Sequence, residues 1–314
     1  MKIVVLDDYQ RVASTFAPWE SLDAEVVFVH QHLVGAALVD ALREASVVVA
    51  MRERTAFDEA LLRELPSLRL LITTGGANAS IDVTAAGSLG VTVCGTRSLA
   101  SPAAELTWAL ILAVTRQVPS SDAGMRSGGW QTTLGTELAG KTLGLVGLGR
   151  LGQRVARVGL AFEMEVLAWS QNLSPSVARS LEVVPTSKDE LLARSDVVSL
   201  HLRLSDRTRG IISAGDLAQM KPSAYLVNTS RGPLVDEPAL IAALRSGAIA
   251  GAALDVYDEE PLPPDHSLRT TPGTVLTPHL GYVTDGGYRV FYGDAVEDVR
   301  AWQSGTPVRE LAGS

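Results

Sequence analysis

Three side chains with proton-transferring or anion-binding chemistry follow apolar runs late in the chain: Arg231, Glu260 and His279. A histidine titrates near neutral pH, so it can give a proton to a substrate and take it back. A neighbouring carboxylate orients the imidazole, and the planar guanidinium of arginine binds carboxylates through paired hydrogen bonds. Each residue alone would ordinarily be a loop or surface residue. All three, however, occur where a strand is expected to end, and ligands bind at the carboxyl ends of strands in open α/β sheets.

A glycine-rich segment precedes these residues in the chain. Gly147, Gly149 and Gly152 form a GxGxxG pattern between the apolar run Thr142–Val146 and the helix-forming run Gln153–Leu160. The first glycine allows a tight turn, the second lets the backbone approach a pyrophosphate, and the third lets the helix pack on the strand. The start of the helix supplies amide donors and partial positive charge. In this setting the pattern predicts dinucleotide binding, whereas a bare glycine-rich turn would not.

The position that usually distinguishes NAD from NADP lacks its expected residue. An acidic side chain normally ends the second strand of such a fold and binds the ribose 2′-hydroxyl. Here the run Glu165–Trp169 is followed by Ser170, Gln171 and Asn172, and the nearest downstream arginine is Arg179. Without a carboxylate there is no charge to repel a 2′-phosphate, so we expect NAD or NADP to bind.

An α/β scaffold is needed to position these residues. Short continuous apolar runs alternate with helix-length amphipathic segments, which is typical of buried parallel strands joined by crossover helices. The runs form two sets, so two open parallel sheets are predicted. The first set comprises strands Lys2–Leu6, Ser46–Met51, Leu68–Thr73 and Val91–Cys94, with helices Asp58–Leu65 and Val83–Leu89. The second comprises strands Thr142–Val146, Glu165–Trp169, Val197–Leu202, Ala224–Asn228, Ala252–Val256 and Val275–Leu276.

Three further segments connect or extend the two sets. An apolar helix is expected at Ala103–Thr115. The stretch Ser120–Thr136 is rich in Ser, Gly and Thr, but it carries Trp130, a residue type rarely left fully exposed, so we expect a packed connection. A last helix at Tyr288–Ser304 could cap the second domain or cross back to the first, and the pattern alone leaves both open.

Length and composition define the class of protein. A chain of 314 residues, 46% hydrophobic and 20% charged, suggests an ordinary globular protein of about two domains. A net charge of −8 without a cluster of Lys and Arg argues against nucleic acid as a partner. The single cysteine, Cys94, excludes an internal disulfide and a thiolate-rich metal site, and no metal is expected. No run resembles a signal peptide or a membrane span, so no membrane partner and a cytoplasmic location are expected.

The motifs, in their order and spacing, resemble those of the D-2-hydroxyacid dehydrogenase family. Downstream of the GxGxxG pattern come N-x-x-R-G at Asn228, D-V-x-x-x-E-P at Asp255 and T-P-H-x-G at Thr277. The resemblance covers essentially the whole chain and implies hydride transfer between NAD(P)H and a 2-keto acid or D-2-hydroxy acid. It implies that Arg231 binds the carboxylate and carbonyl of the substrate, that His279 is the general acid/base, and that Glu260 pairs with His279.

The resemblance also implies a set of cofactor contacts. Besides the three glycines, they are Arg150, Leu151, Ser170, Leu202, Arg203, Thr229, Ser230, Asp255 and Gly281. Asp255 is expected to help hold the nicotinamide carboxamide. Two positions depart from the family pattern, because Arg203 stands where a proline is common and Ser170 replaces the acidic ribose ligand. Both departures lie in the expected cofactor pocket and leave the catalytic residues intact.

On the substrate side, the resemblance implies a loop whose backbone amides hold the substrate carboxylate. The matching residues are Gly75, Gly76, Ala77 and Asn78. Adjacent glycines expose amides without obstruction, as in an anion-binding nest, although a flexible turn is a serious alternative. Arg52 aligns with a position that can reach the anionic end of the substrate, and a plain surface arginine is an equal alternative.

The resemblance finally implies a domain plan and a partner. Because the family's chain crosses back, we expect a Rossmann-type NAD(P)-binding domain at 99–282 inserted into a flavodoxin-like substrate domain of residues 1–98 and 283–314. A homodimer is expected, with contacts through Ala103–Thr115 and the segment after it, although that helix could equally be an ordinary buried core helix. Two alternatives remain: a cofactor-sensing, corepressor-like binding protein of the same fold, and a formate dehydrogenase, for which we would expect an N-terminal extension.

Overall fold

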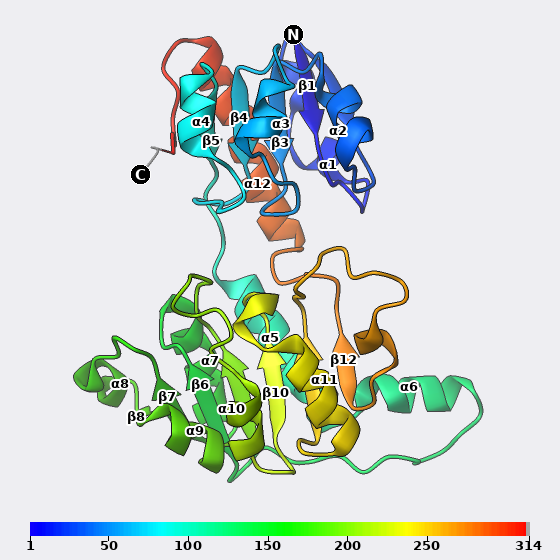
Figure 1. The fold of residues 1–314 in the computed structure, drawn as a ribbon, viewed down its shortest axis with the longest axis vertical. Coiled ribbons are helices and arrows are strands. Elements are labelled where there is room, and N and C mark those ends of the chain that lie inside the picture. The colour runs from blue at the N-terminus through cyan, green and yellow to red at the C-terminus, as the bar shows by residue number, and fades with distance from the viewer. Residues whose placement is uncertain (312–314) are drawn as a thin grey trace. The chain divides into compact units, whose positions relative to one another are not determined.

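The computed structural model describes residues 1–311 and contains two compact units (Figure 1). Unit 1 consists of Met1–Leu99 and Val283–Ser314, of which residues 312–314 lie outside the described part, and unit 2 consists of Ala100–Tyr282. Each unit has its own parallel sheet with helices in its crossovers. The predicted fold class, two open parallel-sheet α/β domains with one inserted into the other, is confirmed.

Unit 1 has a five-stranded sheet in the order β2-β1-β3-β4-β5, with all strands parallel, which is the flavodoxin-like order. Every residue of the central strands β3 and β4 is buried on either face, so their sequences are continuously apolar rather than alternating. Strand β2 is absent from the prediction because it lies at the edge, begins with an exposed glutamate and is only half-buried. The strands are β1 (Lys2–Val5), β2 (Glu25–Phe28), β3 (Val47–Ala50), β4 (Leu70–Thr73) and β5 (Thr92–Gly95).

The helices of unit 1 are short except for the last one. Asp58 and Asp82 cap α3 and α4 by accepting hydrogen bonds from backbone amides of the first turn, each at 2.8 Å. The long helix α12 begins after Thr284, earlier than predicted, and belongs to unit 1 (orange in Figure 1). The helices are α1 (Ala13–Phe16), η1 (Trp19–Ser21), α2 (Gly35–Leu42), α3 (Glu59–Arg63), α4 (Val83–Ser88) and α12 (Asp285–Gln303).

The chain after α12 covers the outer edge of β5. Glu310 forms an antiparallel bridge with Cys94, and the Leu311 amide donates to the Val93 carbonyl at 2.8 Å. Arg309 ties this tail to α12, because its guanidinium contacts the Asp298 carboxylate at 2.9 Å and the Glu297 carboxylate at 2.8 Å. Asp298 is fully buried, and burial raises the pKa of its carboxyl to about 7.

Unit 2 has a seven-stranded parallel sheet in the order β12-β11-β10-β9-β6-β7-β8. Counted within the unit, this is the Rossmann order extended by one strand, with the reversal of direction between β6 and β9. The two-residue edge strand β8 is absent from the prediction because it is too short and too exposed to leave a pattern. The strands are β6 (Thr142–Val146), β7 (Glu165–Trp169), β8 (Val184–Pro185), β9 (Val197–Leu200), β10 (Tyr225–Asn228), β11 (Gly251–Leu254) and β12 (Thr274–Leu276).

The helices of unit 2 pack beside this sheet, with one exception. The exception is α6, in which no residue is buried (Figure 1). The prediction of a packed connection at Ser120–Thr136 is therefore wrong for a single chain, since Trp130 is 73% exposed. The helices are α5 (Ser101–Thr115), α6 (Val118–Arg126), α7 (Arg150–Ala161), α8 (Pro175–Ser180), α9 (Lys188–Arg194), α10 (Ala214–Gln219), η2 (Gly232–Leu234), α11 (Glu237–Ser246) and η3 (Ser267–Thr270).

Residues 1–311 contain neither a candidate membrane span nor a candidate metal cluster. In this part of the chain, no helix combines the length and the apolar character needed to cross a membrane. Nor does the same range contain three or more His, Cys, Asp or Glu side chains grouped so that they could hold a metal ion.

Replacing Arg309 with methionine should destabilise unit 1, because the buried Asp298 carboxylate loses its cation. We expect the free energy of unfolding to fall by roughly 2 to 4 kcal/mol at about pH 8. At about pH 5 the loss should be smaller, because Asp298 is then protonated in the folded state and needs no cation. Urea titrations of both proteins at the two pH values measure this difference.

A matched control is Arg63→Met. Arg63 pairs with Glu59 across one turn of α3 at an exposed site, so its loss should change the free energy of unfolding by less than about 0.5 kcal/mol. Equal losses in the two variants would contradict a structural role for the buried pair.

Candidate active site

The glycine loop after β6 has the close contacts that its sequence predicts. Gly147 has a φ of +108°, and a Cβ there would lie 2.6 Å from the carbonyl oxygen of His201. A Cβ on Gly152 would lie 2.2 Å from the carbonyl oxygen of Gly147, so the helix can approach the strand only with glycine at this position. Around Gly149, in contrast, no atom lies within 4 Å of the Cβ position. The loop is therefore tight on its inner side and open where a pyrophosphate would approach, which fits a dinucleotide.

The first turn of α7 supplies donors at this open side. The Gln153 amide makes the first intrahelical bond, to the Gly149 carbonyl at 2.9 Å. The amides of Arg150, Leu151 and Gly152 precede it and so have no partner within the helix. Backbone N–H groups at a helix start, together with the helix dipole, bind phosphates. The predicted contacts Arg150 and Leu151 thus lie in a turn whose amides are suited to a phosphate.

The neighbouring strand ends lack an acidic side chain, as predicted. Ser170 follows β7 and is half-buried, and its carbonyl accepts a hydrogen bond from the Leu173 amide at 3.1 Å. After β9, Leu202 packs beside the glycine loop, with its Cδ2 atom 3.1 Å from the Cβ position of Gly147. Arg203 is exposed, and its carbonyl accepts from the Thr208 hydroxyl at 2.7 Å. Its side chain takes no part in the packing of the loop.

His201, between these elements, is a residue that the prediction leaves without a role. Burial lowers the pKa of its imidazole to about 4, so the ring is neutral at physiological pH. Its Nε2 atom lies 3.0 Å from the Ser199 hydroxyl. The His201 carbonyl also packs against Gly147. His201 is therefore a packing residue under the glycine loop.

The end of β10 forms a turn held by an asparagine. The Asn228 side chain accepts from the Ser230 amide at 3.0 Å and donates to the Arg231 carbonyl at 2.8 Å. The hydroxyl groups of Thr229 and Ser230, both predicted cofactor contacts, form internal hydrogen bonds, with the Thr107 hydroxyl at 2.8 Å and the Leu200 carbonyl at 2.7 Å. These two side chains thus shape the turn that presents Arg231.

Glu260 and His279 lie in direct contact. The Nδ1 atom of His279 is 2.5 Å from an oxygen of the Glu260 carboxylate, and the other oxygen accepts from the Tyr257 amide at 3.0 Å. The carboxylate therefore fixes both the orientation and the tautomer of the ring. Because Nδ1 faces Glu260, Nε2 is the atom left for proton exchange with a ligand.

The buried Asp255 carboxylate anchors the turn that carries His279. One oxygen accepts from the Thr277 hydroxyl at 2.6 Å and the Leu280 amide at 2.7 Å, and the other from the Gly281 amide at 2.8 Å. Burial raises the pKa of Asp255, although these donors and His279 oppose the shift. Asp255 and Gly281 are predicted as cofactor contacts, but in the structure they bind each other. The spacing of two motifs, each after a strand, could have indicated this contact.

Arg231 reaches the same edge of the sheet. Strands β10, β11 and β12 are adjacent and parallel, so Arg231, Glu260 and His279 all follow carboxyl ends of neighbouring strands. The next residue, Gly232, packs so closely that a Cβ would lie 2.0 Å from the backbone of Tyr257. The arginine segment and the glutamate loop are therefore in contact, and the three predicted catalytic residues share one edge.

In unit 1, the predicted substrate residues form one cluster at the carboxyl ends of β3 and β4. Arg52 donates to the Thr74 carbonyl at 3.2 Å, and its guanidinium nitrogen lies 1.8 Å from where a Cβ of Gly75 would be. The side-chain amide of Asn78 donates to the Arg52 carbonyl at 2.6 Å. One expectation needs correction, because the Gly75 amide donates to the Thr96 hydroxyl at 2.7 Å and is thus already engaged.

The amides of Gly76 and Ala77 differ from that of Gly75. Within residues 1–311, neither of these two backbone amides donates a hydrogen bond to another group of the protein. Gly76 also has open space around its Cβ position, with the nearest atom 3.9 Å away. These two amides are the part of the predicted nest that can bind an anion.

Known proteins resemble this chain over much of its length. The family model for the NAD binding domain of D-isomer specific 2-hydroxyacid dehydrogenases matches residues 108–281. Glyoxylate reductase from Aeropyrum pernix is 43% identical over 234 residues, which are 71% of this chain and 70% of that protein. A crystal structure of phosphoglycerate oxidoreductase from Vibrio cholerae superposes with a TM-score of 0.93 at 38% identity, covering 97% of this chain and 99% of that one.

A longer relative matches as well. D-3-phosphoglycerate dehydrogenase from Mycobacterium bovis is 40% identical over 266 residues, 84% of this chain but 50% of that protein, so this chain spans about half of its length. These relatives bear the names of enzymes and give no support to the corepressor-like alternative. With the NAD-binding model matched across most of unit 2, the chain belongs to the D-isomer specific 2-hydroxyacid dehydrogenase family.

Proposed function

We propose that this chain reduces a 2-keto acid with NADH or NADPH, and oxidises the corresponding D-2-hydroxy acid in the reverse direction. The observation that carries the proposal is the contact of 2.5 Å between His279 and Glu260, at the sheet edge that also holds Arg231. A proton donor, its carboxylate partner and a fixed cation are the groups that carbonyl reduction requires besides the hydride. The same edge belongs to the domain that the family model identifies as NAD-binding.

Each of the three residues has one task in this proposal. Arg231 binds the substrate carboxylate and polarises the carbonyl. As the carbonyl carbon gains a hydride, the carbonyl oxygen takes a proton from Nε2 of His279. Solvent later returns a proton to the imidazole. Glu260 balances the positive charge of the imidazolium and holds the ring in place. When bound, the nicotinamide supplies the hydride or, in reverse, accepts it.

Unit 1 is proposed to supply the remaining substrate contacts. The Gly76 and Ala77 amides form a small donor pair suited to a carboxylate. Arg52, held against Gly75, adds a positive charge to the same loop. We infer from this that unit 1 is the substrate domain and unit 2 the cofactor domain.

Arg231 already provides the charge that polarises the carbonyl, so we expect activity to be unchanged by EDTA. A cytoplasmic location stays a prediction.

His279→Gln should abolish most turnover while leaving cofactor binding near normal, because it removes the proton donor but not the glycine loop. We expect kcat to fall by about 10² to 10⁴, the usual contribution of a general acid/base. The assay is loss of reduced cofactor with glyoxylate, hydroxypyruvate, pyruvate, phenylpyruvate or 3-phosphohydroxypyruvate. Titration of cofactor fluorescence provides the control, and turnover retained in the variant would refute the role of His279.

Ser170→Asp should make the protein selective for NADH. A carboxylate at the end of β7 would accept from the ribose 2′-hydroxyl and repel a 2′-phosphate, so we expect kcat/KM with NADPH to fall by at least about tenfold. Ser170→Asn is the neutral control and should leave the ratio of kcat/KM values for the two cofactors close to that of the wild type. If the wild type already prefers NADH by a large factor, tolerance of NADP is wrong.

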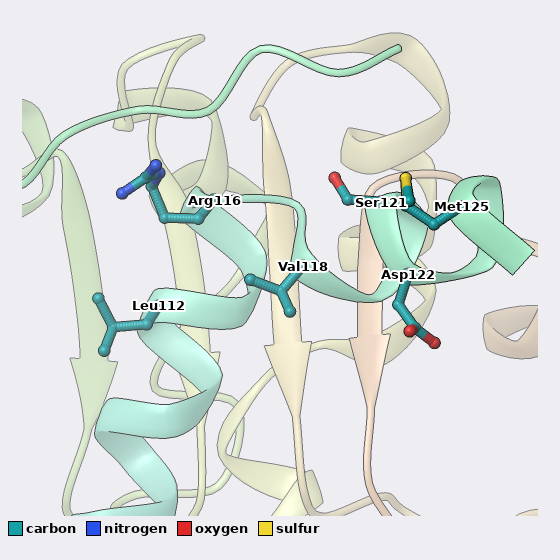
Figure 2. A pocket seen from close by; sticks show the side chains of 6 residues that line it. All are labelled: Leu112, Arg116, Val118, Ser121, Asp122 and Met125. Carbon is teal, nitrogen blue, oxygen red and sulfur yellow. The ribbon is translucent and has the colours of Figure 1, made fainter. Parts of the chain in front are cut away.

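A homodimer is proposed to form through α5, α6 and the segment that follows. Figure 2 shows the hollow between the last turn of α5 and α6, lined by apolar and polar side chains from both helices. Beyond it, Trp130 and Leu134 are 73% and 89% exposed in the single chain. Large apolar side chains left exposed beside a helix without a buried residue support a surface that another protein covers.

Replacing both Trp130 and Leu134, as Trp130→Ser with Leu134→Asp, should convert the dimer to a monomer. The two apolar side chains lose their favourable burial, and the added carboxylate would be buried without a partner. Light scattering after size exclusion measures the mass directly. The exposed apolar residue Val34, on the other unit, supplies the control Val34→Asp, which should leave the mass unchanged. A monomeric wild type would contradict the proposal.

A further inference from the structure

A second histidine–carboxylate pair joins the two segments that carry Arg231 and Glu260. Glu237 is the first residue of α11, at the end of the segment that begins with Arg231 and η2. His266 ends the loop that begins after β11 and carries Glu260. The Nε2 atom of His266 lies 3.0 Å from the Glu237 carboxylate, and both side chains are mostly buried. We call this contact the Glu237–His266 bridge.

The bridge is oriented by its surroundings. The Nδ1 atom of His266 accepts from the Leu268 amide at 3.3 Å, so the ring proton is on Nε2 and points at Glu237. Glu237 therefore binds the end of the glutamate loop through His266.

Other contacts hold the parts of the loop that the bridge does not reach. Arg269 donates to the Pro263 carbonyl at 2.7 Å and to the Leu262 carbonyl at 2.6 Å. Gly232 packs against the peptide between Tyr257 and Asp258, within a distance that excludes any side chain. The loop is thus fastened to its own base by Arg269 and to the arginine segment by Gly232 and Glu237.

The charges at the bridge indicate more than a stabilising ion pair. Burial raises the pKa of Glu237, and the nearby Asp258 carboxylate raises it further, while His266 lowers it. Asp258 in turn faces Arg209, Asp236 and His266, and burial raises its pKa too. Two carboxylates close together in a partly buried place are costly, so hydrophobic residues would serve stability better.

We propose that the Glu237–His266 bridge is a positioning device for catalysis, which fixes the Glu260 loop against the Arg231 segment so that the Glu260 carboxylate stays on Nδ1 of His279. The inference rests on the proposed function. Neither Glu237 nor His266 touches the substrate in this scheme. They act through Glu260, in the way that outer partners orient the ligands of a metal site.

The kinetic test uses Glu237→Ala, Glu237→Gln and His266→Phe. We expect Glu237→Ala and His266→Phe to lower kcat by about 10- to 100-fold with little change in the cofactor dissociation constant. Glu237→Gln keeps an oxygen that can accept from Nε2 of His266 and should restore most of the kcat. In a Glu260→Gln background, His266→Phe should lower kcat by less than about a further twofold, because the carboxylate that His266 positions is already lost. Full additivity of the two changes would overturn the proposal.

A spectroscopic test does not depend on turnover. A short hydrogen bond between His279 and Glu260 gives a far-downfield proton resonance on the histidine nitrogen, which 15N-histidine labelling assigns. Glu237→Ala should weaken or abolish this resonance in the folded protein. Lys221→Gln is the matched control, because it breaks a contact of 2.9 Å with Asp196, at the amino end of β9, and should leave the resonance intact.

The two tests separate the possible failures. A wild type that reduces none of the keto acids would refute the proposed function, while the resonance would still decide whether the bridge positions Glu260. A resonance unchanged in folded Glu237→Ala would overturn the positioning role even if the enzyme is active. If circular dichroism shows that Glu237→Ala does not fold, Glu237→Gln and His266→Phe decide the question. Glu237→Gln should weaken the resonance slightly, and His266→Phe should weaken it strongly.

Discussion

The candidate site depends above all on one buried carboxylate, Asp255. It is fully buried at the end of β11 and accepts three hydrogen bonds from the turn after β12. Those bonds hold His279 with a φ of +54°, a left-handed conformation that is costly outside glycine and asparagine. Without the three donors the buried charge itself would be unfavourable, so anion and turn stabilise each other. This mutual dependence places the imidazole within reach of Glu260.

Much of this arrangement could be predicted from the sequence because the strongest signals come from the most buried parts. Central strands such as β3 and β4 are apolar throughout, and the glycine pattern is constrained by contacts of 2.2 to 2.6 Å between backbone atoms and Cβ positions. The edge strands β2 and β8 lack that signal, since they are half-exposed. Trp130 shows a different difficulty, because its residue type predicts burial whereas its side chain is 73% exposed in the single chain.

The hydrogen-bond partners of individual polar side chains are harder to predict than their positions. Thr229, Ser230 and Asp255 lie where cofactor contacts are expected, yet hydrogen bonds to the protein use their side chains. Gly75 likewise uses its amide within unit 1. A sequence pattern shows which residues share a strand end, but the partner of each donor depends on distances of a few tenths of an ångström. These side chains hold the surrounding backbone amides and a few cations in fixed positions. The protein has a net charge of −8, so those amides and cations must provide the local positive potential that attracts anionic ligands.

The division of unit 1 between the two ends of the chain sets an order of assembly during synthesis. All of unit 2 precedes α12 in the chain, so its seven-stranded sheet can emerge from the ribosome and begin to form before α12 does. Unit 1 has its five strands first but receives α12 and the Arg309–Leu311 tail last. Until then the outer edge of β5 and the apolar surface under α12 are uncovered. Of the two units, unit 1 is therefore begun before unit 2 and completed after it, and in that interval its open strand edge can pair with other chains.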